Sequence, residues 1–275
     1  MRVHGSRCLV VGGARRLGRE LALGLAAEGA SVCVSSRTRS DAEVLVPHLA
    51  QAGAPHAAAV AGDVRAPTRA AALVRAAATA LGGLDAMVYA ASGPFVPRRP
   101  EQLDEAAWDA SLDTVAKGFF FAACAARAAF VAGDGTDAPA GVGVSTAADG
   151  PPGGAPSDGC RGAERGVVVA ITDYLGLQPW AAFAAHGAAK AAQIHLVKEL
   201  ARAWAADGVR VCGVAPGPVD LADDEHRAAT LRAAARSEAE RLVTPAQVVA
   251  AVRLCLENEG MTGVNVIVDA GSLLG

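Results

Sequence analysis

The sequence predicts a single α/β domain, built as a doubly wound parallel sheet of about seven strands with helices on both faces. Short apolar runs, many of them rich in β-branched residues, alternate along the chain with alanine-rich segments of helical character. This alternation is typical of repeated strand–helix–strand units, which form parallel sheets. A length of 275 residues suits one such domain, and an apolar content of 52% is ample for its core.

The elements follow from this alternation in chain order. The runs predicted as strands are Cys8–Val11, Ser31–Ser35, His56–Ala61, Ala86–Ala90, Gly166–Ile171, Val209–Val214 and Asn265–Val268. The segments predicted as helices are Leu17–Glu28, Ser40–Ala52, Thr68–Leu81, Leu103–Val131, Trp180–Ala206 and Pro245–Glu257. Right-handed crossovers between such strands give a Rossmann-like sheet that binds its ligands at the carboxyl ends of the strands.

Two segments fall outside the alternation. Gly133 to Arg165 is rich in Gly, Pro, Ala, Ser and Asp without an apolar period, which predicts a flexible or disordered insert. Because it leads from a helix into the start of a strand, we expect it opposite the ligand edge, as a surface excursion rather than a lid. The segment from Pro216 to about Glu240 leaves the carboxyl end of a strand and is the better lid candidate.

Composition excludes several other classes of protein. A net charge of −3, with only three lysines and no stripe of basic and aromatic residues, argues against nucleic-acid binding. The six cysteines show no CxxC or zinc-ligand spacing, so we expect reduced thiols and no metal site. No apolar run reaches ~18 residues without a charge, and the first residues lead almost directly into a strand. These features predict a cytoplasmic protein with neither a signal peptide nor a membrane span.

Glycines mark a candidate nucleotide site between the first strand and the first helix. Gly12 and Gly18 would let a pyrophosphate approach the backbone at a helix N-terminus, although a purely structural turn is an open alternative. An NAD site usually carries an acid at the end of the second strand, whereas Ser36 and Arg37 stand there. A 2′-phosphate would be attracted to Arg37, with Arg15 nearby, so NADP(H) is favoured unless these arginines are merely solvated.

The ordered motifs resemble those of the short-chain dehydrogenase/reductase family over the whole chain except the insert. The resemblance rests on the glycine turn, "GDV" at Gly62–Val64, "APGPV" at Ala215–Val219 and the closing "VIVDAG" at Val266–Gly271. "GGARRLG" and "ITDY" resemble the pteridine reductases in particular, because Arg16 and Asp173 stand where that group has Arg and Asp. The resemblance implies an NADPH-dependent reductase, a homotetramer or homodimer, and a small-molecule substrate. It implies cofactor contacts from Gly12, Arg15, Arg16, Leu17, Gly18, Ser36, Arg37, Asp63, Val64, Ala91, Ser92, Lys190, Pro216 and Gly217.

The catalytic positions depart from the family pattern. In "AAHGAAK", Lys190 matches the family's lysine, but His186 stands four residues before it, where the family has tyrosine. Val115 stands where an asparagine is expected, and "YAAS" at Tyr89–Ser92 replaces "NNAG". The phenylalanine that stacks on the substrate in pteridine reductases, expected near Pro94, is at best Phe95.

Several interpretations of His186 remain open. With Asp173 to stabilise a positive imidazole ring, His186 and Lys190 could form a working catalytic set for a substrate that needs little acid assistance. Tyr174, or else Tyr89, could replace the missing phenol. His186 could also line a vestigial pocket of an NADPH-binding regulator. The main rival is a non-redox enzyme that uses His186 in a cyclisation, elimination or isomerisation.

Overall fold

The computed structural model describes residues 1–93, 95, 97–132, 164–222 and 227–274. Its seven strands form one sheet in the order β3-β2-β1-β4-β5-β6-β7, and all neighbouring strands run parallel. The predicted fold class is therefore confirmed. The strands are β1 Arg7–Val11, β2 Ser31–Ser36, β3 Ala57–Ala61, β4 Ala86–Tyr89, β5 Gly166–Ile171, β6 Val209–Pro216 and β7 Asn265–Val268.

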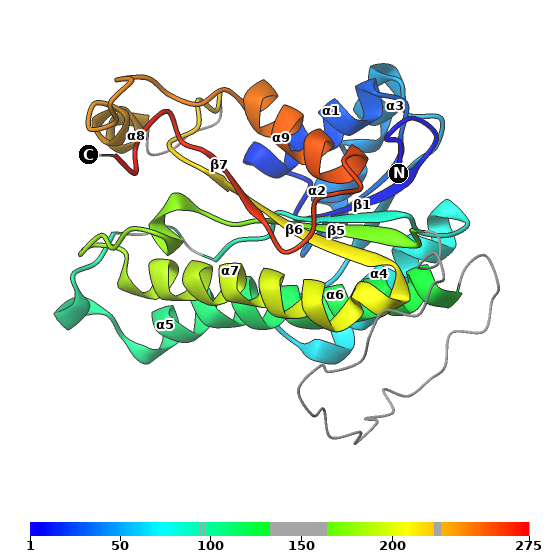
Figure 1. Cartoon of the computed structure of the whole chain (residues 1–275), viewed down its shortest axis with the longest axis horizontal. Coiled ribbons are helices and arrows are strands. Elements are labelled where there is room, and N and C mark those ends of the chain that lie inside the picture. Colours follow the sequence, from blue (N-terminus) through cyan, green and yellow to red (C-terminus); the bar gives the residue numbers. More distant parts are fainter. Residues whose placement is uncertain (94, 96, 133–163, 223–226, 275) are drawn as a thin grey trace, which may run out of the picture.

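Helices cover both faces of the sheet (Figure 1). One face packs against α1 (Arg16–Ala27), α3 (Val46–Ala52) and α9 (Pro245–Glu257). The other packs against α4 (Pro67–Leu81), α6 (Gly118–Ala132) and α7 (Ala184–Trp204). Successive residues of β1 alternate between the two cores, as side chains of a strand must. Because both faces are buried, the strands read as continuous apolar runs rather than alternating ones.

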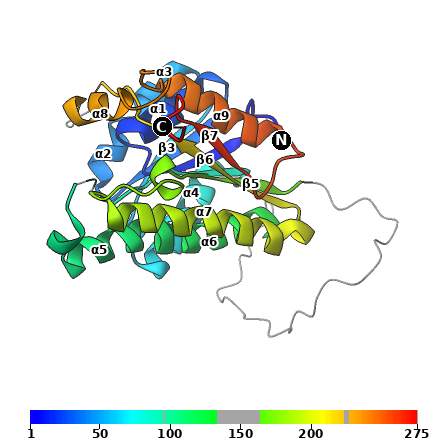
Figure 2. The same ribbon diagram turned by 60° about the vertical axis from the view of Figure 1, so that its left-hand side comes forward.

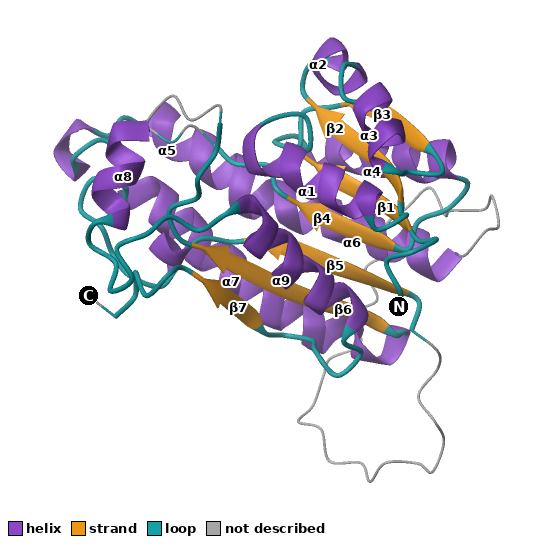
Figure 3. Cartoon of the chain, turned by 90° about the horizontal axis from the view of Figure 1, so that it is seen from above, coloured by secondary structure: helices purple, strands orange, loops and turns teal. Residues whose placement is uncertain are grey.

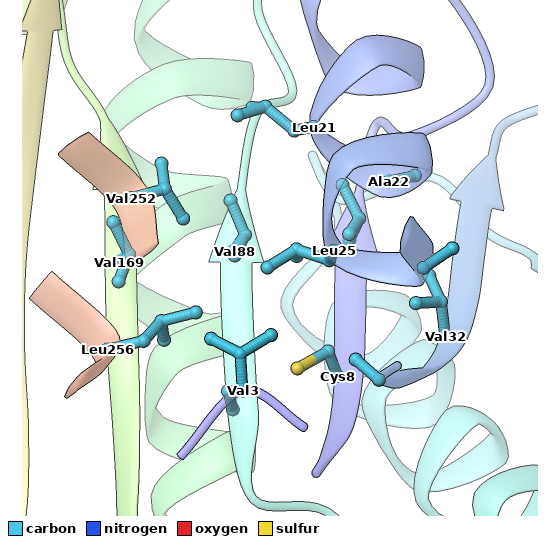
Figure 4. Close-up of a cluster of buried hydrophobic side chains, with 14 of the residues drawn as sticks. Val3, Cys8, Leu21, Ala22, Leu25, Val32, Val88, Val169, Val252 and Leu256 are labelled. Carbon is cyan, nitrogen blue, oxygen red and sulfur yellow. The ribbon is translucent and has the colours of Figure 1, made fainter. Parts of the chain in front are cut away.

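Branched aliphatic side chains fill the first of these cores. Figure 4 shows Leu25 of α1 near Val88 of β4, and Val252 of α9 near Val169 of β5. These residues are fully buried or nearly so. The prediction of an ample core is thus confirmed. Helices α1 and α9, from opposite ends of the sequence, both pack their side chains against this face of the sheet.

Three predicted helices differ in detail from the observed ones. The segment Ser40–Ala52 is split into α2 (Arg39–Glu43) and α3, with Pro47 in the first turn of α3, where its missing N–H costs nothing. Leu103–Val131 contains α5 (Glu105–Leu112), a π-helical turn (Asp113–Lys117) and α6. Asp104 begins α5 because its carboxylate accepts a hydrogen bond from the Ala107 N–H at 2.8 Å. The predicted Trp180–Ala206 helix begins later, at Ala184.

The two irregular segments are only partly described. Almost all of the predicted insert, residues 133–163, lies outside the described residues. In the candidate lid, residues 227–234 form α8 (Arg227–Ala234), which was not predicted as a helix. Figures 2 and 3 show α8 beyond the carboxyl ends of the strands.

The continuous helical stretch Glu105–Ala132 meets a criterion of length and mean hydropathy for a membrane span. This is weak evidence, because a core helix of a soluble protein passes the same test. In α6, Phe119, Ala122 and Ala126 are fully buried within the second core, whereas 39% of the apolar window as a whole is buried.

Candidate active site

The first part of the site is the turn between β1 and α1. Gly12 has a φ of 76°, and a Cβ there would lie 2.8 Å from the backbone N and Cα of Ala91. A Cβ on Gly18 would collide with the carbonyl oxygen of Gly12. The sheet order places this turn at a topological switch point, because β1 lies between β2 and β4. The glycines therefore bring the backbone of β1, the start of α1 and the end of β4 together.

Two neighbouring residues shape this turn further. The Gly12 N–H donates to Ser35 Oγ at 3.3 Å, and the Gly13 N–H donates to the Ser35 carbonyl at 3.1 Å. Arg16 has a φ of 50°, a left-handed conformation that disfavours a side chain. Strain of this kind concentrates at functional sites. Ser35 was not among the predicted contacts, although its position at the end of an apolar strand could have suggested it.

Charged side chains surround the ends of β2 and β3. Arg37 is exposed just after β2. Arg15 is paired with Asp41 at 2.8 Å, and Asp63 is paired with Arg65 at 2.6 Å. The Arg65 hydrogen bonds hold the pKa of Asp63 at about 2, with a smaller contribution from the charge of Arg37. A ligand at this end would therefore meet Arg37 directly, whereas Arg15 and Asp63 already have partners that the sequence did not reveal.

A hydrogen-bonded pair lies at the end of β5. His186 Nε2 is 3.1 Å from Asp173 Oδ2, and the His186 ring is almost fully buried. The other carboxylate oxygen of Asp173 accepts from the Leu175 N–H at 2.9 Å, which fixes the carboxylate at the start of a 3₁₀ turn. His186 Nδ1 is buried and has no partner among the described residues. Asp173 thus orients the imidazole, and Nδ1 is the ring nitrogen that makes no hydrogen bond within the described part of the chain.

Lys190 lies one helical turn beyond His186 and is also buried. Its Nζ donates to the Ile171 carbonyl at 2.7 Å and to Gln193 Oε1 at 3.2 Å. Burial lowers the pKa of Lys190 to about 8, and the negative charge of Asp173 opposes that shift. Gln193 was missed by the sequence analysis. The signal was that His186, Lys190 and Gln193 follow one another at intervals of four and three residues. This spacing puts all three on one helix face that is otherwise apolar.

The two tyrosines that could replace the missing phenol, Tyr89 and Tyr174, lie in different environments. Tyr89 is fully buried, and its hydroxyl donates to the Thr114 carbonyl, so the proposal of Tyr89 as a donor is wrong. Tyr174 lies next to Asp173 and is partly buried. Burial and the Asp173 charge raise the pKa of Tyr174, which makes it a weaker acid. Val115 is fully buried in the π-helical turn and supplies no polar group.

A cleft adjoins His186 on the side of α5. Phe95 meets the His186 ring edge-on at 5.0 Å between centroids and stacks on Phe183 at 4.4 Å. The Arg98 N–H donates to the Ala182 carbonyl at 2.9 Å, which ties the loop after β4 to the start of α7. The cleft is mostly apolar and is lined by Arg98, Leu103, Ala107, Ser111, Ala182, Phe183, Ala184, Ala185 and His186.

The remaining predicted residues lie around the same edge of the sheet. Pro216 ends β6, and Gly217 follows it, where a Cβ would lie 2.8 Å from the Asp269 Cα. Ala91 and Ser92 follow β4, Val64 follows β3, and Ser36 ends β2. Leu17 and Gly18 lie in the first turn of α1. The predicted residues thus come from the carboxyl ends of β1 to β6 and from the starts of α1 and α7. They bring acid–base groups and a glycine turn to the same edge of the sheet.

Comparison with known proteins shows which family shares this sequence. Residues 6–138 match a family model described as short chain dehydrogenase, and residues 158–272 match one described as enoyl-(acyl carrier protein) reductase. An uncharacterized oxidoreductase of Mycobacterium tuberculosis is 30% identical, with 98% of this chain and 93% of that protein covered. A Streptomyces antibioticus protein named "probable oxidoreductase" is 33% identical over 79% of this chain. The chain spans 65% of the length of that Streptomyces protein.

Solved structures agree with this assignment. A short chain dehydrogenase from Burkholderia cenocepacia J2315, solved in complex with NADP, superposes with a TM-score of 0.78 at 25% identity. The alignment covers 99% of this chain and 100% of the Burkholderia chain. A dehydrogenase/reductase from Sinorhizobium meliloti 1021 also gives 0.78 at 25% identity, over 98% of this chain and 96% of that one. The chain belongs to the short-chain dehydrogenase/reductase family.

Proposed function

We propose that the protein is an NADPH-dependent reductase of the pteridine-reductase type. Its substrate would be an unusual heterocyclic or secondary-metabolite compound that carries a C=N, C=C or C=O bond. The observation that carries the proposal is the Asp173–His186 hydrogen bond of 3.1 Å beside buried Lys190, at the edge of the sheet that holds the glycine turn. A mostly apolar cleft next to His186 suits a planar or aliphatic substrate better than a highly charged one.

The described residues fit a dinucleotide. The Gly12 turn leaves no room for a Cβ beside Ala91, and the N-terminus of α1 follows at once, which suits a pyrophosphate. Exposed Arg37 would hold the 2′-phosphate, and Lys190 would hold the nicotinamide ribose. The bound cofactor would supply the hydride. The NADP complex of the Burkholderia relative supports the choice of NADPH.

NADPH is expected to bind at least about tenfold more tightly than NADH, because a single charge-assisted contact is worth about 1.5–3 kcal/mol. Arg37→Asp should remove most of this preference by weakening NADPH in particular. Fluorescence titration with both cofactors measures the two affinities. Arg75→Asp makes the same charge change on an exposed position of α4 and should leave the preference intact. Equal affinities in the wild type would contradict the cofactor assignment.

In the proposed reaction His186 handles the proton. Asp173 accepts from the Nε2–H, so the substrate heteroatom would meet Nδ1 after substrate binding displaces the side chains that bury this atom, and the proton would pass between Nδ1 and that heteroatom. The buried ring packs edge-on against Phe95, which in turn stacks on Phe183, and this apolar packing favours a defined proton path. Asp173 stabilises the positive ring whenever His186 carries both protons.

The rival is a non-redox enzyme that performs cyclisation, elimination or isomerisation with the same His186. The Asp173–His186 pair favours it, because such a dyad is sufficient for acid–base catalysis without hydride transfer. His186→Tyr separates the two functions. A reductase should keep or increase its NADPH-dependent reduction of activated carbonyls or pterin-like compounds, because Lys190 can still lower the pKa of a phenol. An enzyme that depends on imidazole should lose its native activity.

We also propose that the protein forms a homotetramer through α5, α6 and α7, as the family resemblance implies. On α5 Trp108 is 42% exposed, and on α6 Val131 is 37% exposed. Such apolar side chains on a helix pair suggest an interface between copies. Light scattering at micromolar concentration is expected to give the tetramer mass. A monomer under these conditions would refute the proposed assembly.

A further inference from the structure

The buried face of α7 carries a row of three polar side chains. Its other buried residues are alanines and larger apolar residues, whereas His186, Lys190 and Gln193 follow one another at spacings of four and three. Residues at these spacings lie on one side of a helix. His186 pairs with Asp173, and Lys190 reaches the end of β5, but Gln193 lies one turn deeper in the helix.

Gln193 is fully buried in this row. Its Oε1 accepts a hydrogen bond from Lys190 Nζ at 3.2 Å, while its Nε2 is buried without a partner among the described residues. A buried amide with an unsatisfied NH₂ group lowers stability, and an apolar side chain of similar size would avoid that cost. The benefit of glutamine at this position must therefore come from its oxygen, and that oxygen contacts Lys190.

Lys190 requires such an acceptor. An ammonium group has three N–H donors and accepts nothing, so every partner must supply a lone pair. The Ile171 carbonyl supplies one at 2.7 Å from the sheet, and Gln193 supplies another from the same helix. The π-helical turn also packs against α7, and its buried Val115 carries no acceptor in its side chain. The second acceptor of Lys190 is thus built into α7 itself.

We propose that Gln193 is a positioning residue for Lys190, whose ammonium group it holds at the end of β5 beside Asp173 and His186. Among the ionisable groups of the described residues, Asp173 after β5 acts on the charge of Lys190, and His186 lies one turn earlier on α7. The Asp113–Lys117 pair lies in the π-helical turn. Gln193 is neutral, so it acts by geometry and by stabilising the charged form of Lys190. The expected effect on NADPH binding rests on the proposed function, whereas the contact itself does not.

Lysine NMR tests the contact directly, because the chain has only three lysines: Lys117, Lys190 and Lys198. The side chains of the intact protein are labelled with ¹³C, and Lys117→Arg and Lys198→Arg assign the signals. Gln193→Met removes the acceptor at similar size and should lower the proton affinity of Lys190 about tenfold, the usual loss for one hydrogen bond to a charged group. Gln193→Glu keeps the acceptor, adds a negative charge and should raise that affinity at least about tenfold.

The signals of Lys117 and Lys198 should not respond to either variant, because both side chains lie outside the buried row. Circular dichroism checks that each variant is folded. Should Gln193→Met fail to fold, the Gln193→Glu titration decides alone. A Lys190 titration that is the same in the wild type and in every folded Gln193 variant overturns the proposal.

Cofactor titration then separates this proposal from the proposed function. If Gln193→Met moves the Lys190 titration and weakens NADPH binding several-fold, both stand. If the Lys190 titration moves but NADPH binds neither protein, the positioning role stands and the cofactor assignment fails. If the titration does not move while NADPH binds the wild type tightly, the reductase proposal stands and the role of Gln193 is wrong.

Discussion

His186→Ala is expected to lower kcat/KM about 10²–10⁴-fold, the usual loss when a positioned acid–base group is removed. His186 contacts Asp173 through its imidazole ring, which alanine lacks, and alanine cannot transfer a proton. NADPH affinity should change little, because the glycine turn and Arg37 remain. Initial rates with an activated carbonyl or a pterin-like substrate, together with NADPH titration, measure both effects.

His195→Ala is the matched control for this experiment. His195 lies on the same helix, but its side chain is 72% exposed and pairs with Glu199 at 3.4 Å. Its removal should leave kcat/KM and cofactor affinity unchanged. Equal rates in the wild type and in His186→Ala would show that His186 only lines the pocket, as the vestigial interpretation requires.

Lys190→Met is expected to remove a change of about 3 kcal/mol that the free energy of unfolding of the wild type undergoes between pH 8 and 10.5. Burial places the pKa of Lys190 at about 8 in the folded protein, below its ordinary value of 10.5. The folded state therefore holds an unfavourable charge at all pH values below about 8, and the penalty disappears as the pH rises toward 10.5. A shift of this size corresponds to about 3 kcal/mol. Methionine carries no charge and should show no such dependence.

Urea unfolding of both proteins at several pH values between 7 and 10.5 measures this difference. The free energy of unfolding of Lys190→Met, relative to the wild type, should be most favourable at the lowest pH and should fall as the pH rises. Lys198→Met removes an exposed lysine from the same helix, so it removes no buried charge. A stability difference for Lys190→Met that does not vary with pH would show that the ammonium is not destabilised by burial.

The sheet and its ligand edge could be predicted because their signals are local. Apolar runs and glycine turns define β1 to β7 to within a few residues, and the parallel topology then places Gly12, Arg37 and Asp173 at one edge. Pairings between side chains could not be predicted in this way. The Asp63–Arg65 and Arg15–Asp41 pairs and the Tyr89–Thr114 hydrogen bond depend on rotamers and loop geometry.

Helix boundaries and Gln193 illustrate two other limits. The break between α2 and α3 and the late start of α7 depend on tertiary packing, which overrides helix propensity at such ends. Gln193 escaped attention because its spacing from His186 and Lys190 places it on their helix face but does not show that this face is buried. Only the three-dimensional structure shows that its oxygen contacts a buried ammonium group.

The stoichiometry between NADPH and product tests the proposed function most directly. Absorbance at 340 nm follows NADPH while product is quantified in the same sample, with the wild type and Lys190→Ala compared side by side. A reductase predicts one NADPH consumed for each product formed by the wild type, and loss of both signals in Lys190→Ala. Product that accumulates without any change at 340 nm would contradict hydride transfer and would assign the Asp173–His186 pair to non-redox acid–base catalysis.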